Sequence, residues 1–341
     1  MASDATPLLF GGLYARGEVA EQVSDRAWLQ AMLDVEAAMG GEQLQAADFD
    51  LQELGHEAAD HASPVVPLAK LFPDAHSGAT SQDVIDTAMM LVAKRATRPL
   101  LRDADASAGA AGLWARRHRD RPTLGMTLLQ PALPTTWGLR AAGWMTALDE
   151  AAAQLRATPL PVQMGGPVGA RDPAMAARVA GELGLDEPIL PWQTNRVPVA
   201  RLACALGILA GALSKPARDV TLSPELREGV PGRGGSSAIA HKHNPVAAVS
   251  LLACSRRTPG LVSTMLSSME QELERAAGAW QAEWGTITEL LRLTGSAAAW
   301  ARDLLEHLEL DGAASQAGAG PDLDLQAAAG LVDRALKARP A

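Results

Sequence analysis

Residues 234–245 read GGSSAIAHKHNP and gather more chemically active side chains than any other part of the sequence. The adjacent hydroxyl groups of Ser236 and Ser237 could exchange protons with a substrate, and the ammonium group of Lys242 could bind an anion. The segment ends on Asn244 followed by a proline, residue types that are typical of the first positions of a helix. Because a helix N-terminus offers free N–H groups beside that lysine, we expect the loop to bind a carboxylate.

The same segment has other interpretations. A glycine- and serine-rich stretch before a helix is often a plain connector. It does not match a loop that binds nucleotide phosphates, because no strand is predicted before it and the Gly-x4-Gly-Lys spacing is absent. His241 and His243 alternate as a pair of metal ligands would, but no cysteine or acidic cluster accompanies them. The sequence therefore does not support a nucleotide or zinc site here.

Composition restricts the fold and the class of partner. Of the 341 residues, 48% are hydrophobic and only 4% are aromatic, which favours closely packed helices over a β-sandwich. The formal net charge of -9 argues against a nucleic-acid partner, because phosphate binding needs a concentrated basic surface. No stretch is apolar over the thickness of a bilayer, and no basic region of a signal peptide is present, so we expect no membrane partner.

Two cysteines give the expected compartment. Cys204 and Cys254 lie in apolar stretches with a helical pattern. This position favours buried thiols in a reducing environment over a disulfide. We therefore expect a cytoplasmic protein.

Long helical patterns separated by glycine and proline occupy most of the chain. The stretch SDRAWLQAMLDVEAAMGG predicts a helix capped by Ser24 and ended by two glycines. A second helix is predicted over residues 82–119, where Pro99 must kink or divide it. Further helices are predicted over 131–158, 199–222, 245–274 and 280–310, and a short amphipathic one near the C-terminus after an Ala/Gly/Ser linker. Helices of this length favour a bundle whose faces are covered by partners.

Three segments resemble the signature regions of the fumarase/aspartase superfamily. Residues 234–245 are similar to Gly-Ser-Ser-x-Met-Pro-x-Lys-x-Asn-Pro, with Ile239 and Ala240 in place of Met-Pro. HSGATSQDVIDTA, residues 76–88, resembles the first region, and TLLQPALPTTWGL, residues 127–139, resembles the second. Other segments, among them LPWQTNR and ERAAGAWQAEW, look most like the branch that acts on 3-carboxy-cis,cis-muconate. The resemblance extends to about residue 310.

This resemblance implies a fold and a reaction. The implied all-α fold has a small helical N-terminal domain over residues 1–95, a long five-helix bundle over 96–310 and a reduced C-terminal segment over 311–341. Four bundles would pack into a homotetramer, in which each active site gathers the three regions from different subunits. The implied substrate is a small polycarboxylate, which the muconate branch converts to 4-carboxymuconolactone without a cofactor or metal.

The resemblance also assigns candidate site residues. Ser236, Ser237 and His76 are the candidate catalytic residues, since a stabilised serine alkoxide or an imidazole can move a proton. The candidates for holding the substrate are Thr80, Ser81, Gln82, Thr127, Gln130, Arg196, Lys242 and Asn244, with Glu274 and His241 in support.

Some of these residues have a structural interpretation as well. Thr80 and Ser81 could cap the helix that begins near residue 82. Arg196 could form a structural ion pair with Glu274 instead of binding a substrate carboxylate.

Departures from the family pattern leave alternatives open. Many relatives carry histidine where this chain has Leu128, cycloisomerases typically carry one where it has Pro131, and Leu273 replaces the histidine of a His-Glu-Arg run. One alternative is a lyase that releases fumarate from another succinyl compound, such as adenylosuccinate, argininosuccinate or nitrosuccinate. The other is an inactive structural relative.

Overall fold

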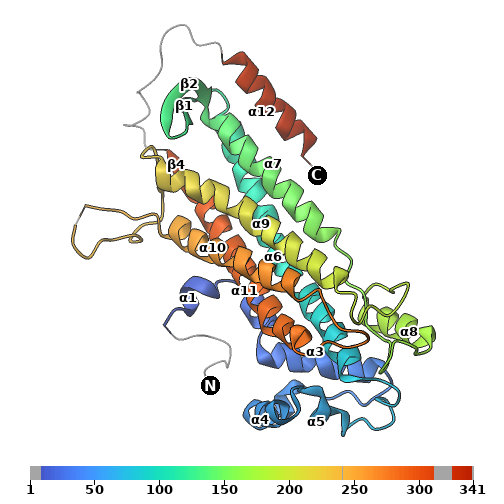
Figure 1. Cartoon of the computed structure of the whole chain (residues 1–341). Coiled ribbons are helices and arrows are strands. Elements are labelled where there is room, and N and C mark those ends of the chain that lie inside the picture. The colour runs from blue at the N-terminus through green and yellow to red at the C-terminus, as the bar shows by residue number, and fades with distance from the viewer. Residues whose placement is uncertain (1–8, 240, 311–324, 340–341) are drawn as a thin grey trace. The chain divides into compact units, whose positions relative to one another are not determined.

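The structure is a computed structural model that describes residues 9–239, 241–310 and 325–339. Helices form most of it and only two short two-stranded sheets occur in this part of the chain, so the predicted all-α class is confirmed. The helices in chain order (Figure 1) are α1 (Gly11–Tyr14), α2 (Val19–Gln22), α3 (Asp25–Ala38), the 3-10 turn η1 (Ala46–Asp48), α4 (Leu51–His61), α5 (Val65–Ala69), α6 (Ser81–Arg117), α7 (Trp137–Arg156), α8 (Pro173–Leu183), α9 (Val197–Leu222), α10 (Val246–Ser267), α11 (Ala279–Glu306) and α12 (Gln326–Ala338). The strands are β1 (Pro122–Thr127), β2 (Gln130–Thr136), β3 (Leu226–Glu228) and β4 (Leu308–Leu310).

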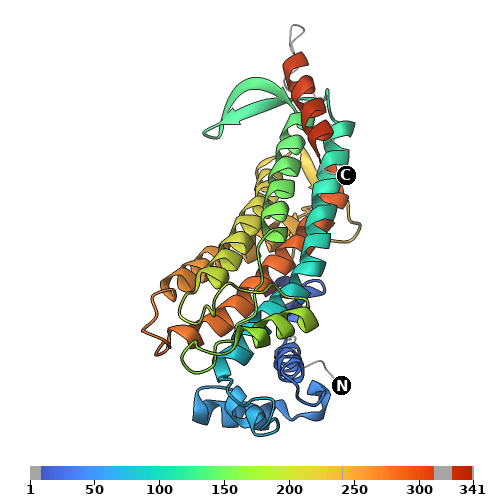
Figure 2. The ribbon, with the colours of Figure 1, turned by 90° about the vertical axis from the view of Figure 1, so that its right-hand side faces the viewer.

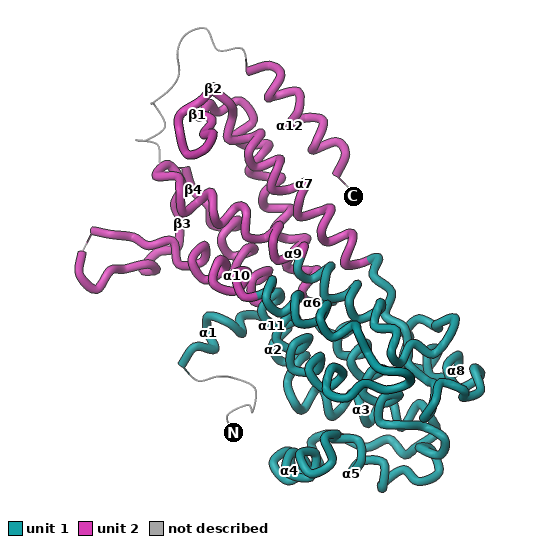
Figure 3. The backbone as a smooth tube through the Cα atoms, viewed as in Figure 1, with its two compact units in different colours: residues 1–99, 157–207, 258–295 teal, residues 100–156, 208–257, 296–341 magenta. Residues whose placement is uncertain are grey.

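The chain forms two compact units, and each unit combines three separate stretches of sequence (Figure 3). Unit 1 contains residues 1–99, 157–207 and 258–295, and unit 2 contains 100–156, 208–257 and 296–341. Helices α6, α9, α10 and α11 each begin in one unit and end in the other. The predicted consecutive domains therefore differ from these units. The predicted linker at 311–324 lies outside the described residues, whereas the predicted C-terminal helix is present as α12.

Helix α3 confirms the predicted start and stop signals. The Oγ atom of Ser24 accepts a hydrogen bond from the backbone N–H of Ala27 at 3.2 Å, which satisfies one of the free donors of the first turn. The helix ends at Ala38 just before Gly40, whose φ of 108° lies in the left-handed region. Its buried side includes Leu29 and Leu33.

Helix α6 runs through Pro99 without a break, so of the two predicted outcomes, a kink or a division, the division does not occur. Proline removes one backbone hydrogen bond from a helix. The neighbouring side chains Ala96 and Leu100 are completely buried. Packing on both sides of the proline therefore keeps the two halves in one helix.

Residues 131–136, predicted as the start of a helix, form strand β2 instead. β2 pairs antiparallel with β1, and Thr127 faces Gln130 across the connecting turn. The residue before a proline avoids the helical region, so Pro131 and Pro134 favour extended backbone in this stretch. Figure 2 shows the hairpin projecting from the start of α7. Pro131 and Pro134, which were predicted to open a long helix, therefore lie in a strand, and the helix begins at Trp137.

Aromatic side chains form part of the core of unit 2. The ring of Trp114 on α6 lies 5.9 Å from that of Trp137 and 6.1 Å from that of Trp144, both on α7. The indole N–H of Trp144 donates to Asp219 at 2.8 Å, and that of Trp137 donates to Glu225 at 3.0 Å. These bonds satisfy the polar edge of two large buried rings.

Candidate active site

The loop over residues 234–245 is closed at its base within unit 2. The backbone N–H of Asn244 donates to the carbonyl oxygen of Gly234 at 2.7 Å, and Gly235 and His243 form an isolated antiparallel bridge. The loop precedes the first turn of α10 and projects away from the helices of unit 2 (Figure 3). Its tip, residue 240 excepted, is exposed, including the side chains of His241 and Lys242. A fixed base and an exposed tip suit a segment that closes on a ligand.

Ser236 has a polar environment within this loop. Its Oγ atom accepts hydrogen bonds from the backbone N–H groups of Ala238 at 3.3 Å and Ile239 at 3.1 Å. Two N–H donors directed at one oxygen stabilise negative charge on that oxygen. The side chain of the neighbouring Ser237 is exposed. The geometry thus favours Ser236 over Ser237 as the oxygen that can carry a charge.

The N-terminus of α10 is already occupied by a carboxylate of this chain. Glu228 on β3 accepts hydrogen bonds from the backbone N–H groups of Ala247 at 3.2 Å and Ala248 at 2.9 Å. The expectation that these N–H groups would bind a substrate carboxylate, with Asn244 as the helix cap, is therefore wrong. A buried carboxylate at the helix N-terminus is stabilised by the same free N–H groups and dipole.

Glu228 also anchors the loop through Arg233. The Arg233 guanidinium donates to Glu228 at 3.1 Å and to Asp303 on α11 at 2.7 Å. Both carboxylates are almost completely buried. The ion pairs therefore fix the chain immediately before Gly234.

Gly234 should be required for the hydrogen bond between Asn244 and Gly234 that closes the base of the loop. Its φ is +85°, and a Cβ atom there would lie 2.3 Å from the carbonyl oxygen of Asn244. We expect Gly234→Ala to open the base of the loop, because strain in this region costs about 1–3 kcal/mol. Hydrogen–deuterium exchange of a peptide spanning the loop should then show faster exchange of the Asn244 amide.

Gly235→Ala is the matched control, since a Cβ atom at Gly235 meets nothing within 4 Å. Equal exchange rates in the two variants and the unmodified protein would contradict a steric role of Gly234.

The second region lies at the tip of the β1–β2 hairpin in unit 2. The side chains of Thr127 and Gln130 are exposed beside each other, and neither forms a side-chain hydrogen bond within the described residues. Between them, Leu128 and Leu129 have φ values of 51° and 62°. Left-handed backbone at two successive leucines is strained. Both polar side chains are therefore free to bind a ligand.

Two positions at which the family resemblance led us to expect histidine are exposed and have left-handed backbone. Leu128 is 96% exposed, and Leu273, in the connection between α10 and α11, has φ +43° and is 87% exposed. The carbonyl oxygen of Leu273 accepts a hydrogen bond from Thr194 at 2.8 Å. Neither side chain can donate or accept a proton, so each site offers an apolar contact instead.

The first region forms the turn before α6 in unit 1. The Asp83 carboxylate accepts the backbone N–H of Thr80 at 3.1 Å, so the helix start is capped by Asp83 and not by the Thr80 or Ser81 hydroxyl groups. Neither hydroxyl group forms a hydrogen bond within the part of the chain that the structure describes, and both side chains are half-buried. These two candidates therefore remain available to a ligand.

His76 in the same turn is held by a buried acid. Its Nδ1 atom lies 2.7 Å from Oε1 of Glu36 on α3. The Glu36 side chain is completely buried, and that of His76 is 17% exposed. The other ring nitrogen, Nε2, forms no hydrogen bond with the described residues.

Arg196 is a correction to the predicted binding residues. Its completely buried guanidinium donates all five N–H groups inside unit 1: to both oxygens of Asp86 at 2.6 and 3.0 Å, to both oxygens of Glu283, one of them at 3.0 Å, and to the Gln193 carbonyl oxygen at 2.8 Å. No donor remains for a substrate carboxylate. Glu274, predicted as its alternative partner, is not among these acceptors. Burial raises the pKa of Glu283 to about 7 although Arg196 opposes this shift.

Gln82 is also a correction. The side chain is buried, and its amide group donates to Asp86 at 3.0 Å and to the Gln193 carbonyl oxygen at 3.0 Å. Trp280 donates to the same Asp86 carboxylate at 2.9 Å. Gln82 therefore belongs to the buried cluster around Arg196 and cannot direct its N–H groups at a ligand.

A glycine-rich loop that the sequence analysis did not single out packs against the first region. The Asp83 carboxylate accepts the backbone N–H groups of Gly165 at 2.8 Å and Gly166 at 2.9 Å. A Cβ atom on Gly166 would lie 2.7 Å from the carbonyl oxygen of Gly78. Burial raises the pKa of Asp83, although these hydrogen bonds oppose the shift. The sequence signal for this loop was the stretch QMGGPVG, whose glycines allow two backbones to touch.

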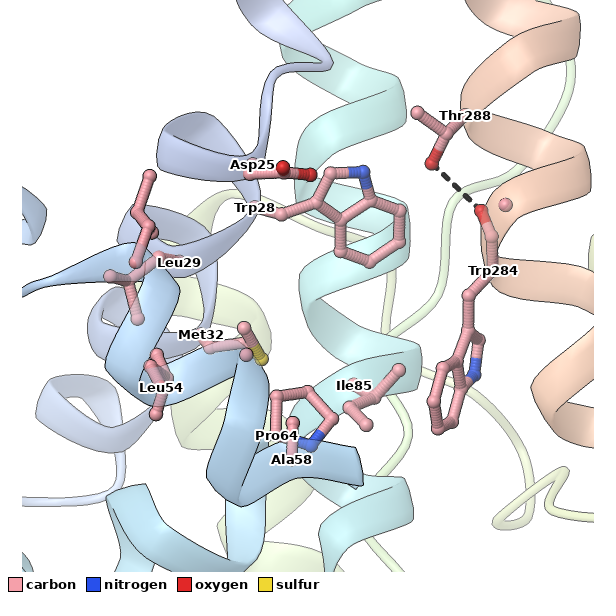
Figure 4. A pocket seen from close by; sticks show the side chains of 13 residues that line it. Asp25, Trp28, Leu29, Met32, Leu54, Ala58, Pro64, Ile85, Trp284 and Thr288 are labelled. Atoms are coloured by element: carbon pink, nitrogen blue, oxygen red, sulfur yellow. Dashed lines mark hydrogen bonds between the residues drawn. The ribbon is translucent and has the colours of Figure 1, made fainter. Parts of the chain in front are cut away.

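A pocket of about 400 Å³ in unit 1 is separate from all of these residues. Figure 4 shows the indole rings of Trp28 on α3 and Trp284 on α11 along its wall, with Met32, Leu54 and Ile85. The lining is mostly apolar and includes one acid, Asp25, and no cation. It is therefore unsuited to a polycarboxylate.

The structure distributes the candidate residues over both units. His76, Thr80, Ser81, Gln82, Arg196 and Glu274 belong to unit 1, and Thr127, Gln130, Ser236, Ser237, His241, Lys242 and Asn244 belong to unit 2. Within the described residues, no group of three or more His, Cys, Asp or Glu side chains could hold a metal ion. The residues that remain available include hydroxyl groups, two amides, two imidazoles and a lysine, a set suited to binding an anion and moving a proton.

Comparisons with known proteins agree with the sequence resemblance. The profile of a lyase family matches residues 67–260. A 3-carboxy-cis,cis-muconate cycloisomerase of Bradyrhizobium diazoefficiens is 37% identical, over 92% of this chain and 79% of that protein. A nitrosuccinate lyase of Streptomyces davaonensis is also 37% identical, over 85% of this chain and 72% of that protein. The crystal structure of a 3-carboxy-cis,cis-muconate lactonizing enzyme from Pseudomonas putida superposes with a TM-score of 0.83 and 30% identity, over 96% of this chain and 87% of that one.

Proposed function

This chain belongs to the lyase family within the fumarase/aspartase superfamily, and from that premise we propose that it is a 3-carboxy-cis,cis-muconate cycloisomerase. The substrate's own carboxylate adds across a double bond, the adjacent carbon gains a proton, and 4-carboxymuconolactone forms. The reaction belongs to the breakdown of aromatic compounds, and we place the enzyme in the cytoplasm. The observation that carries this proposal is near full-length similarity to cycloisomerases in both sequence and fold.

The loop over residues 234–245 supplies the central chemistry in this proposal. Ser236 transfers the proton, since its oxygen accepts two backbone N–H groups that stabilise the alkoxide. Lys242 and Asn244 bind substrate carboxylates as the loop closes. Ser237 is an additional hydroxyl donor, and His241 supports the loop.

The hydroxyl and amide groups of the first and second regions orient the substrate. Thr80 and Ser81 donate from one region, and Thr127 and Gln130 from the other. His76 is the opposite proton donor or acceptor. Because no metal or redox group is required for intramolecular addition of a carboxylate, these side chains are sufficient for the reaction.

A nitrosuccinate-lyase-like activity is the second candidate. The observation that favours it is the 37% identity to the Streptomyces davaonensis enzyme, which equals that to the cycloisomerase. Both reactions generate negative charge beside a substrate carboxylate, so the same loop could serve either. The cycloisomerase proposal takes precedence because a crystal structure that is similar over most of both chains is that of a lactonizing enzyme.

An ultraviolet assay distinguishes the two activities. The purified protein should remove the conjugated diene of 3-carboxy-cis,cis-muconate and form a lactone without releasing fumarate. Parallel reactions with nitrosuccinate, adenylosuccinate and argininosuccinate would report fumarate. Fumarate release from nitrosuccinate, without loss of the diene, would replace the proposal with the lyase activity. The absence of a reaction with any of the four compounds would indicate an inactive relative.

We further propose that the protein is a homotetramer. The expectation that no stretch is apolar over the thickness of a bilayer is corrected by helix α9, which is long and apolar enough by length and composition alone, although half of its most apolar window is buried inside this chain. On unit 2, Ile208 of α9 and Val249 of α10 are 48% and 52% exposed. Exposed apolar side chains on long helices favour burial against other copies of the chain.

Ile208→Arg should therefore dissociate the tetramer, because a charged side chain in an apolar interface remains unpaired. Size-exclusion chromatography with light scattering would measure the mass. Leu71→Arg is the matched control, since Leu71 is 53% exposed but lies outside the bundle helices. A tetramer that survives Ile208→Arg unchanged would rule out this face as an interface.

A further inference from the structure

We propose that Glu36 is a positioning residue that fixes the tautomer and the orientation of the His76 imidazole. The inference rests on the proposed function, in which His76 exchanges a proton with the substrate. It begins from an unusual group: the Glu36 carboxyl is completely buried in the last turn of α3. A buried carboxylate is costly unless it is paired.

The partner of Glu36 is the imidazole of His76. Oε1 of Glu36 lies 2.7 Å from Nδ1 of His76, while Oε2 of Glu36 is buried and forms no hydrogen bond within the described residues. In the proposed arrangement the Glu36 carboxylate accepts and Nδ1 donates, so Nδ1 carries the proton. In this tautomer Nε2 presents the lone pair. That nitrogen can accept a proton from solvent and, once protonated, donate it to the substrate carbon.

Hydrogen bonds to the surrounding backbone hold the turn that carries the ring. The N–H of His76 donates to the carbonyl oxygen of Phe72 at 2.8 Å, and its own carbonyl oxygen accepts the N–H of Ala79 at 2.9 Å. Arg171 donates to the carbonyl oxygen of Ser77 at 3.0 Å. The same turn leads directly into the half-buried hydroxyl groups of Thr80 and Ser81. Glu36 therefore orients a ring that is already held beside two candidate binding residues.

Tight packing brings α3 to this turn. A Cβ atom on Gly41, just after α3, would lie 2.7 Å from the ring of Phe72 and 2.9 Å from the carbonyl oxygen of Glu36. The glycine thus allows the end of α3 to touch the segment that carries His76. A carboxylate placed on this helix reaches the imidazole without any movement of the backbone.

The first test measures the tautomer without requiring activity. Solid-state 15N spectra of the full chain labelled at its seven histidines, compared with spectra of His76→Gln, identify the His76 signals. We expect the neutral His76 ring to carry its proton on Nδ1. In Glu36→Gln the amide can donate to Nδ1, so the Nε2–H form should appear. Glu42→Gln, the same change at an exposed position, should leave the spectrum unchanged.

The second test measures turnover of the muconate. Glu36→Gln should lower kcat by about 10- to 100-fold with little change in KM, as expected for a residue that orients a reacting group. In the His76→Gln background the same change should add no further loss, because Glu36 acts through His76. An equal loss in both backgrounds would indicate a purely structural role and overturn the proposal.

The two measurements separate this inference from the proposed function. A proton on Nε2 of His76 in the unmodified protein would overturn the inference even if the muconate is a substrate. A proton on Nδ1 that is lost in Glu36→Gln would support the inference even if the substrate is a carboxylic acid other than the muconate. Should Glu36→Gln fail to fold, the comparison of the unmodified protein with His76→Gln still decides the tautomer.

Discussion

Ser236→Ala is expected to lower kcat for 3-carboxy-cis,cis-muconate by about 10²- to 10⁴-fold, the usual contribution of a positioned acid or base. The alanine removes the oxygen that accepts the N–H groups of Ala238 and Ile239. KM should change little, because Lys242 and Asn244 remain to bind carboxylates. The loss would therefore be confined to an interaction made in the transition state.

Steady-state kinetics on the tetrameric fraction would measure this effect. Ser267→Ala, on the exposed side of α10, provides a serine replacement without an expected effect. Ser237→Ala shows which of the two adjacent serines transfers the proton. Full activity of Ser236→Ala would exclude the proposed role of the loop.

Arg196→Met is expected to lower the free energy of unfolding by about 3–5 kcal/mol, the range for removing one partner of a buried ion pair. The change leaves the Asp86 and Glu283 carboxylates buried without a cation. It also removes one of the two donors to the Gln193 carbonyl oxygen and leaves only the Gln82 amide among the described residues. Methionine has a similar length, so most of the effect would be electrostatic rather than steric.

Urea denaturation at one fixed protein concentration would measure the change. Arg201→Met, at an exposed position of α9, should stay within about 0.5 kcal/mol of the unmodified protein. An Arg196→Met protein as stable as the unmodified one, but with a raised KM, would show that Arg196 binds substrate after all.

The long helices could be predicted because their apolar residues recur with a helical period and their ends carry recognisable caps. Ser24 and the glycines after Met39 gave both ends of α3. The hairpin could not be distinguished in the same way, since Pro131 and Pro134 are compatible both with a helix entrance and with an extended strand. Only the pairing with β1 decides between them.

The site was predictable where local chemistry defines it. The loop with Ser236 and Lys242 is recognisable from adjacent residues alone. The partners of Arg196 are not, because Asp86 and Glu283 lie far away in the chain and look like surface acids in a helical pattern. The pairing of Glu36 with His76 could not be predicted from the sequence for the same reason. Long-range pairing of charges is a property of packing that a single sequence does not display.

The interleaved composition of the two units constrains how the protein is made. The cluster that holds unit 1 together joins Asp86, Arg196 and Glu283, so it cannot form on the ribosome until the last of these residues has emerged. The N-terminal helices are therefore synthesised long before the segments that pack against them, and their apolar faces stay exposed through most of translation. Such delayed closure predicts a nascent chain that binds chaperones and folds after release, rather than segment by segment from its N-terminus.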